Sequence, residues 1–387
     1  MDEFEDRAIA AMSGGAVGDA LGGATEGWTQ AQIAERWGGP VTGIVGPYNL
    51  DWRNARPASP YHKGDGHITD DTLMSHALVR VYERLRRHLD AFAIDSDLVP
   101  EMVDQRHWIP ELETEAVLLQ RVFLAEKWLV LRLRYGHNDP REAGVGNLVN
   151  CGAAMYIAPV GIANAGDPEG AYAEAIDMAG AHQSSYGREA AGVLAAAVAE
   201  ALARGADVES VVAAALAVAK DGTRVAIETV TAAARELSDE TVRDHFALGR
   251  ALRAAVEPFD SVGPVYREPA LDSRKPSRVK AIEELPVALG LLVAAAGDFR
   301  TSVLGAVNYG RDSDSIAGMV GSVIGALYGT AAVPQDWVDS VGEASRMDLR
   351  APGAAMASVA RQIGDHDHAS LQTRLRRRAQ SLSGTRR

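Results

Sequence analysis

Helical periodicity is the feature of this sequence that most restricts its fold. Apolar residues between Met74 and Leu85 recur at the three- and four-residue spacing of one helix face. Residues 189–220 are rich in alanine, which has the highest helix propensity, and a turn-like segment at 204–207 divides them into a predicted helical hairpin. Alternating patterns typical of strands are absent over useful lengths. The sequence therefore predicts an all-α fold, a compact helical bundle.

The chain is expected to form one domain over residues 1–365. Its 387 residues would permit two or three domains of ~100–200 residues each, but no tandem repeat or clear linker divides them. Residues 38–66 and 258–277 are rich in Gly, Pro, Asn, Asp or Ser and are predicted to be long loops, which are usually functional or disordered. The basic tail, residues 366–387, is predicted to be disordered.

Charge and composition argue against several function classes. The net charge of -13 disfavours a nucleic-acid or anionic-lipid partner. A nucleic-acid role for the short basic tail is not expected either, because such tails are common on acidic proteins. Residues 316–333 approach the ~20 residues of a membrane span, but they are rich in Gly and Ala, which predicts a packed core helix. The acidic N-terminus predicts no signal peptide. The single cysteine, Cys151, rules out a disulfide within the chain, and a cytoplasmic location is expected.

Two acidic clusters each precede an apolar helical pattern. The first is Thr69-Asp70-Asp71-Thr72 and the second is Asp312-Ser313-Asp314-Ser315. Either cluster alone fits a helix N-terminus, where hydroxyls cap free N–H groups and the helix dipole favours acids. If the two helices pack side by side, however, four carboxylates converge, and divalent cations would relieve their repulsion and desolvation. Oxygen ligands favour Mg²⁺ or Mn²⁺ over zinc. The residues alone leave caps and a shared metal site as equal alternatives.

Histidines give no support to a zinc site. His62, His67 and His76 lie near the first acidic cluster, but none is spaced from a second ligand as zinc sites require. They are interpreted as loop or helix-surface residues.

A set of motifs, in order along the chain, resembles the ADP-ribosylglycohydrolase family. The set comprises the glycine-rich segment 14–22, the two acidic clusters, Gly152-Ala153-Ala154-Met155, Ala158-Pro159-Val160-Gly161, His182, and Val333-Pro334 before Trp337. Each motif is unspecific alone, but their order and wide separation, from about residue 8 to about residue 340, are specific. The resemblance implies a single all-α domain with two metal ions at its centre.

The resemblance also implies a ligand set for two Mg²⁺ ions, with Mn²⁺ as an alternative. The implied ligands are Thr69, Asp70 and Asp71 for one ion, Asp312 and Ser315 for the other, and Asp314 for both. Ser315 stands where the family more often has threonine, a mild departure because both supply a hydroxyl. In the family, two such metal ions bind the ribose hydroxyls beside the scissile C1″ bond and activate water. Asp314 is accordingly also expected to be catalytic.

Two acids near the glycine-rich segment have different expected roles. Glu26 stands where family members carry an acid near the reaction centre, so it is a candidate general base or ligand of the second metal. The alternative is an exposed loop glutamate. Asp19 is expected to tie helices together rather than to take part in chemistry.

The region from residue 144 to residue 156 resembles the family's substrate loop but departs from it. The substrate-binding candidates are Gly144, Gly146, Asn150, Gly152, Met155 and His182. Backbone N–H groups of such a glycine-rich loop can cradle phosphates. Cys151 and Tyr156 replace an asparagine and an arginine that are common in the family. The stretch between the glycine-rich segment 144–147 and residues 150–152 is also shorter than is common in the family. The sequence therefore leaves open whether the diphosphate pocket keeps the form that it has in the family. Residues 38–66 either shape the entrance to the substrate site or are plain surface, and the sequence favours neither.

The leading hypothesis is a Mg²⁺-dependent hydrolase that removes ADP-ribose from a protein side chain or small molecule, with arginine as the favoured acceptor. One alternative keeps the chemistry but takes another N-ribosyl compound, such as a nucleoside or nucleotide. Another is a non-catalytic module that binds ADP-ribose, although the intact acids argue against it. A monomer is favoured.

Overall fold

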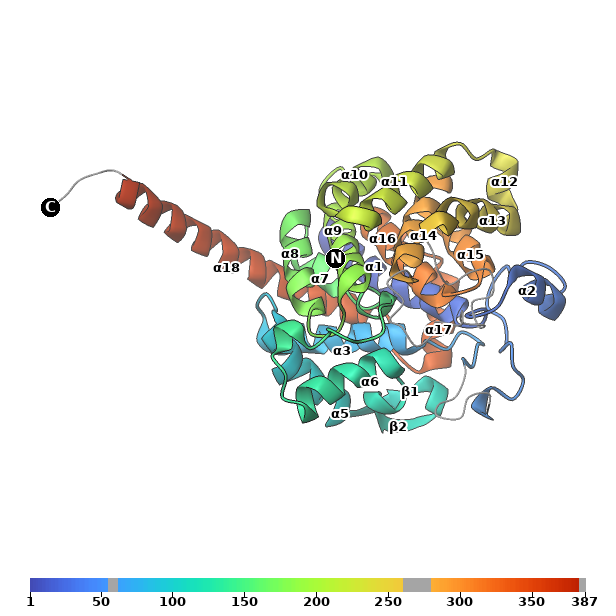
Figure 1. Cartoon of the computed structure of the whole chain (residues 1–387), viewed down its shortest axis with the longest axis horizontal. Coiled ribbons are helices and arrows are strands. Elements are labelled where there is room, and N and C mark those ends of the chain that lie inside the picture. Colours follow the sequence, from blue (N-terminus) through green and yellow to red (C-terminus); the bar gives the residue numbers. More distant parts are fainter. Residues whose placement is uncertain (55–61, 260–279, 383–387) are drawn as a thin grey trace.

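A computed structural model describes residues 1–54, 62–259 and 280–382 of the chain (Figure 1). Helices dominate the fold, which confirms the all-α prediction. They are α1 (Glu3–Gly22), α2 (Gln30–Trp37), α3 (Asp70–Leu85), α4 (Ala91–Ala93), α5 (Val99–Val103), α6 (Leu124–Val130), α7 (Ala158–Ala163), α8 (Pro168–Ala179), α9 (Ser185–Ala201), α10 (Val208–Val218), α11 (Asp221–Arg235), α12 (Asp239–Arg243), α13 (His245–Val256), α14 (Lys280–Ala294), α15 (Phe299–Tyr309), α16 (Ser313–Tyr328), α17 (Gln335–Ser345) and α18 (Ala351–Leu382). Short 3₁₀ and π turns join several of them.

A small antiparallel hairpin interrupts the helices between α5 and α6. Its strands are β1 (Arg106–Ile109) and β2 (Thr114–Val117), with Trp108 opposite Glu115. The sequence did not predict this hairpin, because strands of four residues are too short to show a clear alternation.

Helices α1 and α16 form the centre of the molecule, and their backbones are in direct contact. A Cβ atom on Gly18 would lie 2.1 Å from the carbonyl oxygen of Ala317, and one on Gly22 would lie 2.4 Å from that of Ser313. Only glycine permits this approach, because any larger side chain would overlap with backbone atoms. The contact places the end of α1, and therefore the residues just after it, against the first turn of α16.

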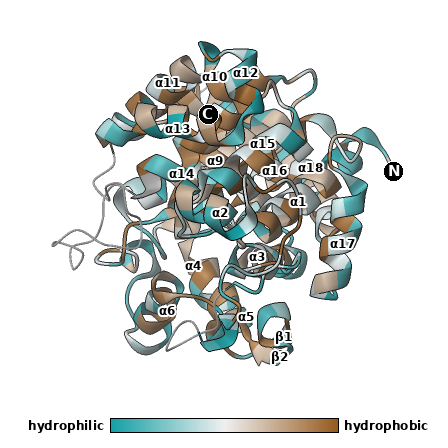
Figure 2. Cartoon of the chain, turned by 90° about the vertical axis from the view of Figure 1, so that its right-hand side faces the viewer, coloured by the Kyte–Doolittle hydropathy of each residue, from teal (hydrophilic) through white to brown (hydrophobic). Residues whose placement is uncertain are grey.

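The other helices cover this central pair on two sides. Figures 1 and 2 show α9, α10, α11 and α13 on one side of α1, and α3, α5, α6 and the hairpin on the other. Helices α9 and α10 confirm the helical hairpin predicted for residues 189–220. The alanines of α9 are almost all buried, and their small side chains let α9 pack closely against α7, α8 and α16.

The apolar stretch 316–333 forms a packed core helix, as predicted, as far as residue 327, and most of the residues after it are at least partly exposed. Residues 319–327 of α16 are buried throughout. No helix in the described part of the chain is long and apolar enough to cross a membrane.

The prediction of a disordered C-terminal tail is wrong for residues 366–382. They continue α18, which leaves the body of the protein and projects into solvent (Figure 1). Apart from a half-buried Asp367 contact with His88, this segment is largely exposed, so its helix does not depend on packing. The physical reason is composition: residues 369–382 contain Leu, Gln, Arg and Ala, all good helix formers, and lack Gly and Pro. Residues 383–387 lie outside the described residues.

The two predicted long loops are only partly described. Residues 38–54 and 62–66 are irregular apart from one 3₁₀ turn at Trp52–Asn54, as expected. Residues 55–61 lie outside the described residues, and so does the second predicted loop from residue 260 onward.

Candidate metal centre

The two acidic clusters lie side by side at the N-termini of α3 and α16. Asp70 and Asp71 are in the first turn of α3, Asp314 is in the first turn of α16, and Asp312 is the N-cap of α16. The hydroxyl of Ser315 donates a hydrogen bond of 2.8 Å to Oδ2 of Asp71, which joins the clusters directly. The structure therefore brings together the acids that the sequence analysis singled out.

Burial and mutual repulsion disfavour the charged forms of these carboxylates. Burial, followed by the charges of neighbouring acids, raises the pKa of Asp71 and of Asp314 well above the ordinary range. Burial also raises the pKa of Asp70 to about 6, although the adjacent Arg121 guanidinium opposes the shift. A divalent cation would reverse this penalty, and carboxylate and hydroxyl oxygens are the ligands that Mg²⁺ and Mn²⁺ prefer. The donor set therefore fits a divalent metal.

Asp19 holds the start of α3 against α1. Its carboxylate accepts hydrogen bonds from the backbone N–H groups of Thr69, at 2.9 Å, and Thr72, at 3.2 Å, and from both threonine hydroxyls. This confirms the expectation that Asp19 ties helices together. Thr69 is also the N-cap of α3 and accepts a hydrogen bond from the N–H of Asp71 at 3.3 Å. Since the Thr69 hydroxyl donates its proton to Asp19, a lone pair can still face a cation.

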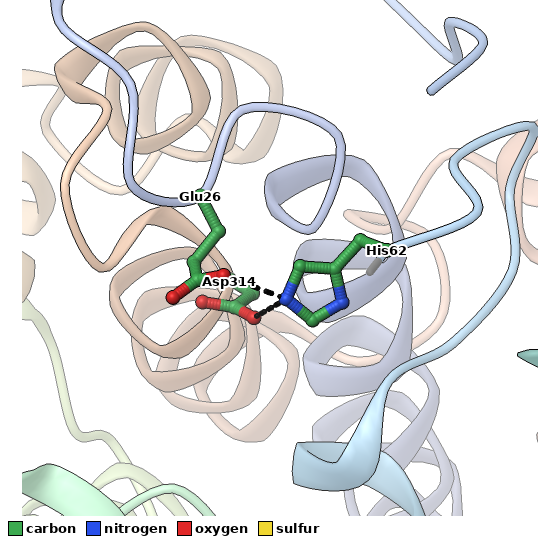
Figure 3. Close-up of side chains that lie close together, drawn as sticks. All are labelled: Glu26, His62 and Asp314. Atoms are coloured by element: carbon green, nitrogen blue, oxygen red, sulfur yellow. Dashed lines mark hydrogen bonds and ion pairs between the residues drawn. The ribbon is translucent and has the colours of Figure 1, made fainter. Parts of the chain in front are cut away.

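Glu26 lies inside the site, in contact with His62 (Figure 3). Its Oε2 is 2.8 Å from Nε2 of His62, which in turn lies 3.5 Å from Oδ2 of Asp314. The side chain of Glu26 is 16% exposed and that of His62 only 2%. The alternative of Glu26 as an exposed loop glutamate is therefore wrong, whereas His62 lies in a loop, as interpreted, but is buried there. The partners that hold His62 inside come from distant parts of the chain, which residue spacing could not reveal.

Glu111 and Arg121 are further site residues that the sequence analysis missed. Arg121 is fully buried, donates a hydrogen bond of 2.8 Å to Oδ1 of Asp70, and pairs closely with the Glu111 carboxylate. Burial acts to raise the pKa of Glu111, but Arg121 and His62 outweigh it and hold that pKa at about 2. Neither residue lies in a motif, and both occur among short turns, so no sequence signal identifies them.

Cys151, one of the departures from the family pattern, contacts the second acidic cluster. Its Sγ lies 3.1 Å from Oδ2 of Asp312 and 3.4 Å from the hydroxyl of Ser315. Burial and the nearby Asp312 and Glu284 carboxylates raise the pKa of the thiol well above its usual value, so it stays protonated. In the described part of the chain, ligand atoms gather closely enough for a cation in two groups: Glu26, His62 and Asp314, and Cys151, Glu284 and Asp312.

Comparison with known proteins settles the family. The family model described as ADP-ribosylglycohydrolase matches residues 1–369. The chain belongs to the ADP-ribosylglycohydrolase family. A solved structure described as an ADP-ribosylglycohydrolase-related protein complex is similar with a TM-score of 0.59 and 23% identity, covering 93% of this chain and 100% of that one, which shows a shared fold. ADP-ribosylarginine hydrolase Tri1 of Serratia proteamaculans (strain 568) is 38% identical over 50 residues, and this match spans 13% of this chain and 14% of the relative.

The family's expected substrate loop packs against the segment that follows α8. Gly144 touches the backbone of Gln183, since a Cβ there would lie 2.4 Å from its carbonyl oxygen, and Gly146 has φ +92°. The Oδ1 of Asn150 accepts hydrogen bonds from Gln183 Nε2, at 2.8 Å, and from the N–H of Gly152, at 3.0 Å. The structure thus gathers these candidates, but their contact with a substrate stays a prediction.

The remaining two substrate-binding candidates are His182 and Met155. His182 is fully buried, with Nδ1 3.1 Å from the Tyr156 hydroxyl and Nε2 3.4 Å from the Glu126 carboxylate. Met155 is partly buried and lines a cavity of about 20 Å³ together with Asp71 and His76. Tyr156, where the family often has arginine, therefore serves as a partner of His182.

His76 is buried on α3, so its interpretation as a helix-surface residue is wrong. Helix α3 is covered by α1, α16 and α18. The Nε2 atom of His76 has no hydrogen-bond partner among the described residues. Burial, aided by the charge of Arg80, lowers the pKa of His76 to about 3. The folded protein therefore holds this imidazole neutral, whereas the unfolded chain binds a proton near pH 6.5.

Acid is expected to destabilise the fold through His76. Because the unfolded state binds the extra proton between about pH 6.5 and pH 3, this group should lower the unfolding free energy by up to ~1.4 kcal/mol per pH unit as pH falls. Urea unfolding of the wild type and His76→Gln in EDTA, at pH 7 and pH 4.5, measures this loss. The variant should show a shallower pH dependence, and the exposed His366→Gln should match the wild type. Equal slopes in all three proteins would contradict the prediction.

Proposed function

We propose that this protein is a metal-dependent hydrolase that cleaves the glycosidic bond between ADP-ribose and an acceptor. The observation that carries the proposal is the convergence of both acidic clusters in one buried site. The buried acids there outnumber the cations: they are Asp19, Asp70, Asp71, Glu111 and Asp314, against Arg121 and, only when it is protonated, His62. Helix capping alone would not require so many carboxylates to share one interior, whereas bound cations would compensate them.

The proposed ligands are those that the family resemblance implies. Thr69, Asp70 and Asp71 would hold one ion, Asp312 and Ser315 the other, and Asp314 both. The ions, Mg²⁺ or Mn²⁺, would supply Lewis acidity and orient the ribose hydroxyls. The contacts between Ser315 and Asp71, and between Asp70 and Arg121, keep these side chains in place before an ion binds.

Glu26 is the proposed general base. Its position beside Asp314 puts a carboxylate at the edge of the site, and it is half-buried, so water can reach it. In the proposed step the oxygen of a water forms a bond to C1″ while the bond from C1″ to the acceptor breaks. Glu26 takes a proton from this water and then gives it to the departing acceptor atom, so the two protons of the water end on the new C1″ hydroxyl and on the acceptor.

An ADP-ribosylated arginine is the proposed substrate. The support is the similarity to the Serratia protein named ADP-ribosylarginine hydrolase Tri1, over 13% of this chain and 14% of that one. The leaving atom would then be a guanidine nitrogen.

A substrate panel tests the proposed function. The panel comprises ADP-ribosyl-arginine and ADP-ribosyl-serine peptides, and simple nucleosides, each with EDTA, Mg²⁺ or Mn²⁺. We expect release of free ADP-ribose from the arginine substrate only when a divalent metal is present. Turnover that is unaffected by EDTA would contradict the metal-dependent mechanism.

A second candidate function is hydrolysis of another N-ribosyl compound, such as a nucleoside. The replacements at Cys151 and Tyr156 favour it, because both side chains turn inward instead of offering an amide and a guanidinium to a diphosphate. Turnover of nucleosides but not of ADP-ribosyl peptides in the same panel would select this candidate. Tight binding of ADP-ribose without turnover of any substrate would instead identify a binding module.

A further inference from the structure

His62 lies between two acids of the proposed metal centre, with one ring nitrogen facing both. Its Nε2 is 2.8 Å from Oε2 of Glu26 and 3.5 Å from Oδ2 of Asp314 (Figure 3). The three ligand atoms all lie within 4.8 Å of one another. Ligands on opposite sides of one ion stand ~4.2 Å apart when each bond is ~2.1 Å long, so all three can reach a single cation with small shifts.

The other ring nitrogen of His62 faces a carboxylate that is fixed in place. Nδ1 lies 3.3 Å from Oε1 of Glu111, and the same oxygen accepts a 2.9 Å hydrogen bond from the backbone N–H of Lys63. Arg121 is 3.1 Å from Nδ1 but closer still to the Glu111 carboxylate. Histidines that bind metals almost always donate their second ring N–H to such a carboxylate, which fixes the tautomer and the ring orientation. A neutral His62 that donates its Nδ1–H to Glu111 would present the lone pair of Nε2 to Glu26 and Asp314.

We propose that His62 is a nitrogen ligand of one ion of the centre, which Asp314 and one oxygen of Glu26 would also contact, and that this ion site selects Mn²⁺ over Mg²⁺. This inference rests on the proposed metal centre. Mg²⁺ is bound almost entirely by oxygen, whereas an imidazole ligand suits first-row transition ions.

Pulsed electron paramagnetic resonance of bound Mn²⁺ tests the inference without relying on activity. The full-length protein is stripped with EDTA and loaded with Mn²⁺. We expect coupling of the ion to a directly bound ¹⁴N nucleus, replaced by a ¹⁵N pattern in protein labelled with ¹⁵N-histidine. The coupling should disappear in His62→Gln. It should persist in His67→Gln, a matched control from the same loop whose Nδ1 instead contacts the carbonyl of Gly64 at 2.8 Å.

Competition between metals provides a second measurement. The wild type should bind Mn²⁺ more tightly than Mg²⁺, and His62→Gln should narrow that ratio by about tenfold or more, the size of effect typical for changes around a metal ligand. His67→Gln should leave the ratio unchanged. Circular dichroism checks that each variant folds. If His62→Gln does not fold, the labelled wild type shows whether a histidine nitrogen binds the ion, and coupling that persists in His67→Gln and His182→Gln excludes those two histidines as its source.

The outcomes separate this inference from the proposed function. Mn²⁺ bound without nitrogen coupling, or coupling that survives in His62→Gln, would overturn the role of His62 and leave an all-oxygen metal centre able to support hydrolysis. Binding of a single Mn²⁺ without nitrogen coupling would also overturn the role of His62 as a ligand. A protonated His62 would then neutralise the acids in place of a second metal ion. Failure of the wild type to bind any divalent metal would overturn both.

Discussion

Replacing Asp314 by alanine is expected to abolish hydrolysis of the ADP-ribosyl bond. Asp314 lies among Asp71, Asp312 and Glu26, the position from which one carboxylate can serve both ions. Loss of a shared ligand should reduce kcat by about 10³-fold or more, or ~4 kcal/mol of barrier, because the cations would no longer be held beside the substrate. The measurements are kcat on ADP-ribosyl-arginine and bound metal per chain by elemental analysis.

The same substitution should leave the metal-free fold intact or more stable. Burial and neighbouring acids raise the pKa of Asp314, so its carboxylate opposes folding at neutral pH when no cation is bound. Urea unfolding in EDTA measures this, and the exposed Asp336→Ala serves as a control for loss of an acid. Near wild-type turnover and metal content in Asp314→Ala would show that the carboxylate is not a shared ligand. A large loss of stability would instead show that Asp314 has a structural role.

The parts of the site that the sequence could predict depend on local patterns. Asp70, Asp71 and Asp314 each stand at the start of a helix with a clear apolar pattern, and helix starts are marked by hydroxyl and acidic residues. The glycine pattern of α1 allows its backbone to touch α16, which is why two clusters more than 200 residues apart meet. Resemblance to a known family supplied the reason to pair them.

The parts that sequence analysis missed depend on contacts between distant elements. His62 is held by Glu26 and Glu111, and Arg121 pairs with Asp70; these partners lie 36–51 residues apart, and His62 and Arg121 stand in segments with no regular period. Periodicity reports which face of a helix is buried, but it cannot report which polar side chain of a loop finds a buried partner. The burial of His76 was missed for a related reason, because α3 is covered on several sides rather than along one face.

The helical continuation of α18 shows the opposite error. Polar, basic composition led to a prediction of disorder for residues 366–382, whereas the propensities of the same residues favour a helix. Charge and lack of apolar residues show only that a segment is not packed. They do not show that it lacks secondary structure.

Replacing Glu26 by glutamine tests the mechanism rather than the architecture. The amide is nearly the same shape and keeps an oxygen beside His62, but it cannot accept a proton from water. If Glu26 is the general base, kcat should fall by ~10²–10⁴-fold, or ~3–5 kcal/mol of barrier, with little change in KM. That combination is the mark of an interaction made only in the transition state.

The control for this experiment is Glu35→Gln, an exposed acid on α2 that should retain wild-type kinetics. Unchanged metal content in Glu26→Gln would show that the loss arises from proton transfer and not from an empty site. Equal falls in kcat and metal content would make Glu26 mainly a ligand, in agreement with its contact to His62. Small changes in both kcat and KM would contradict either role, because a carboxylate at the edge of this acidic site would then touch neither water nor cation. Water would in that case have to be activated by the ions and Asp314 alone.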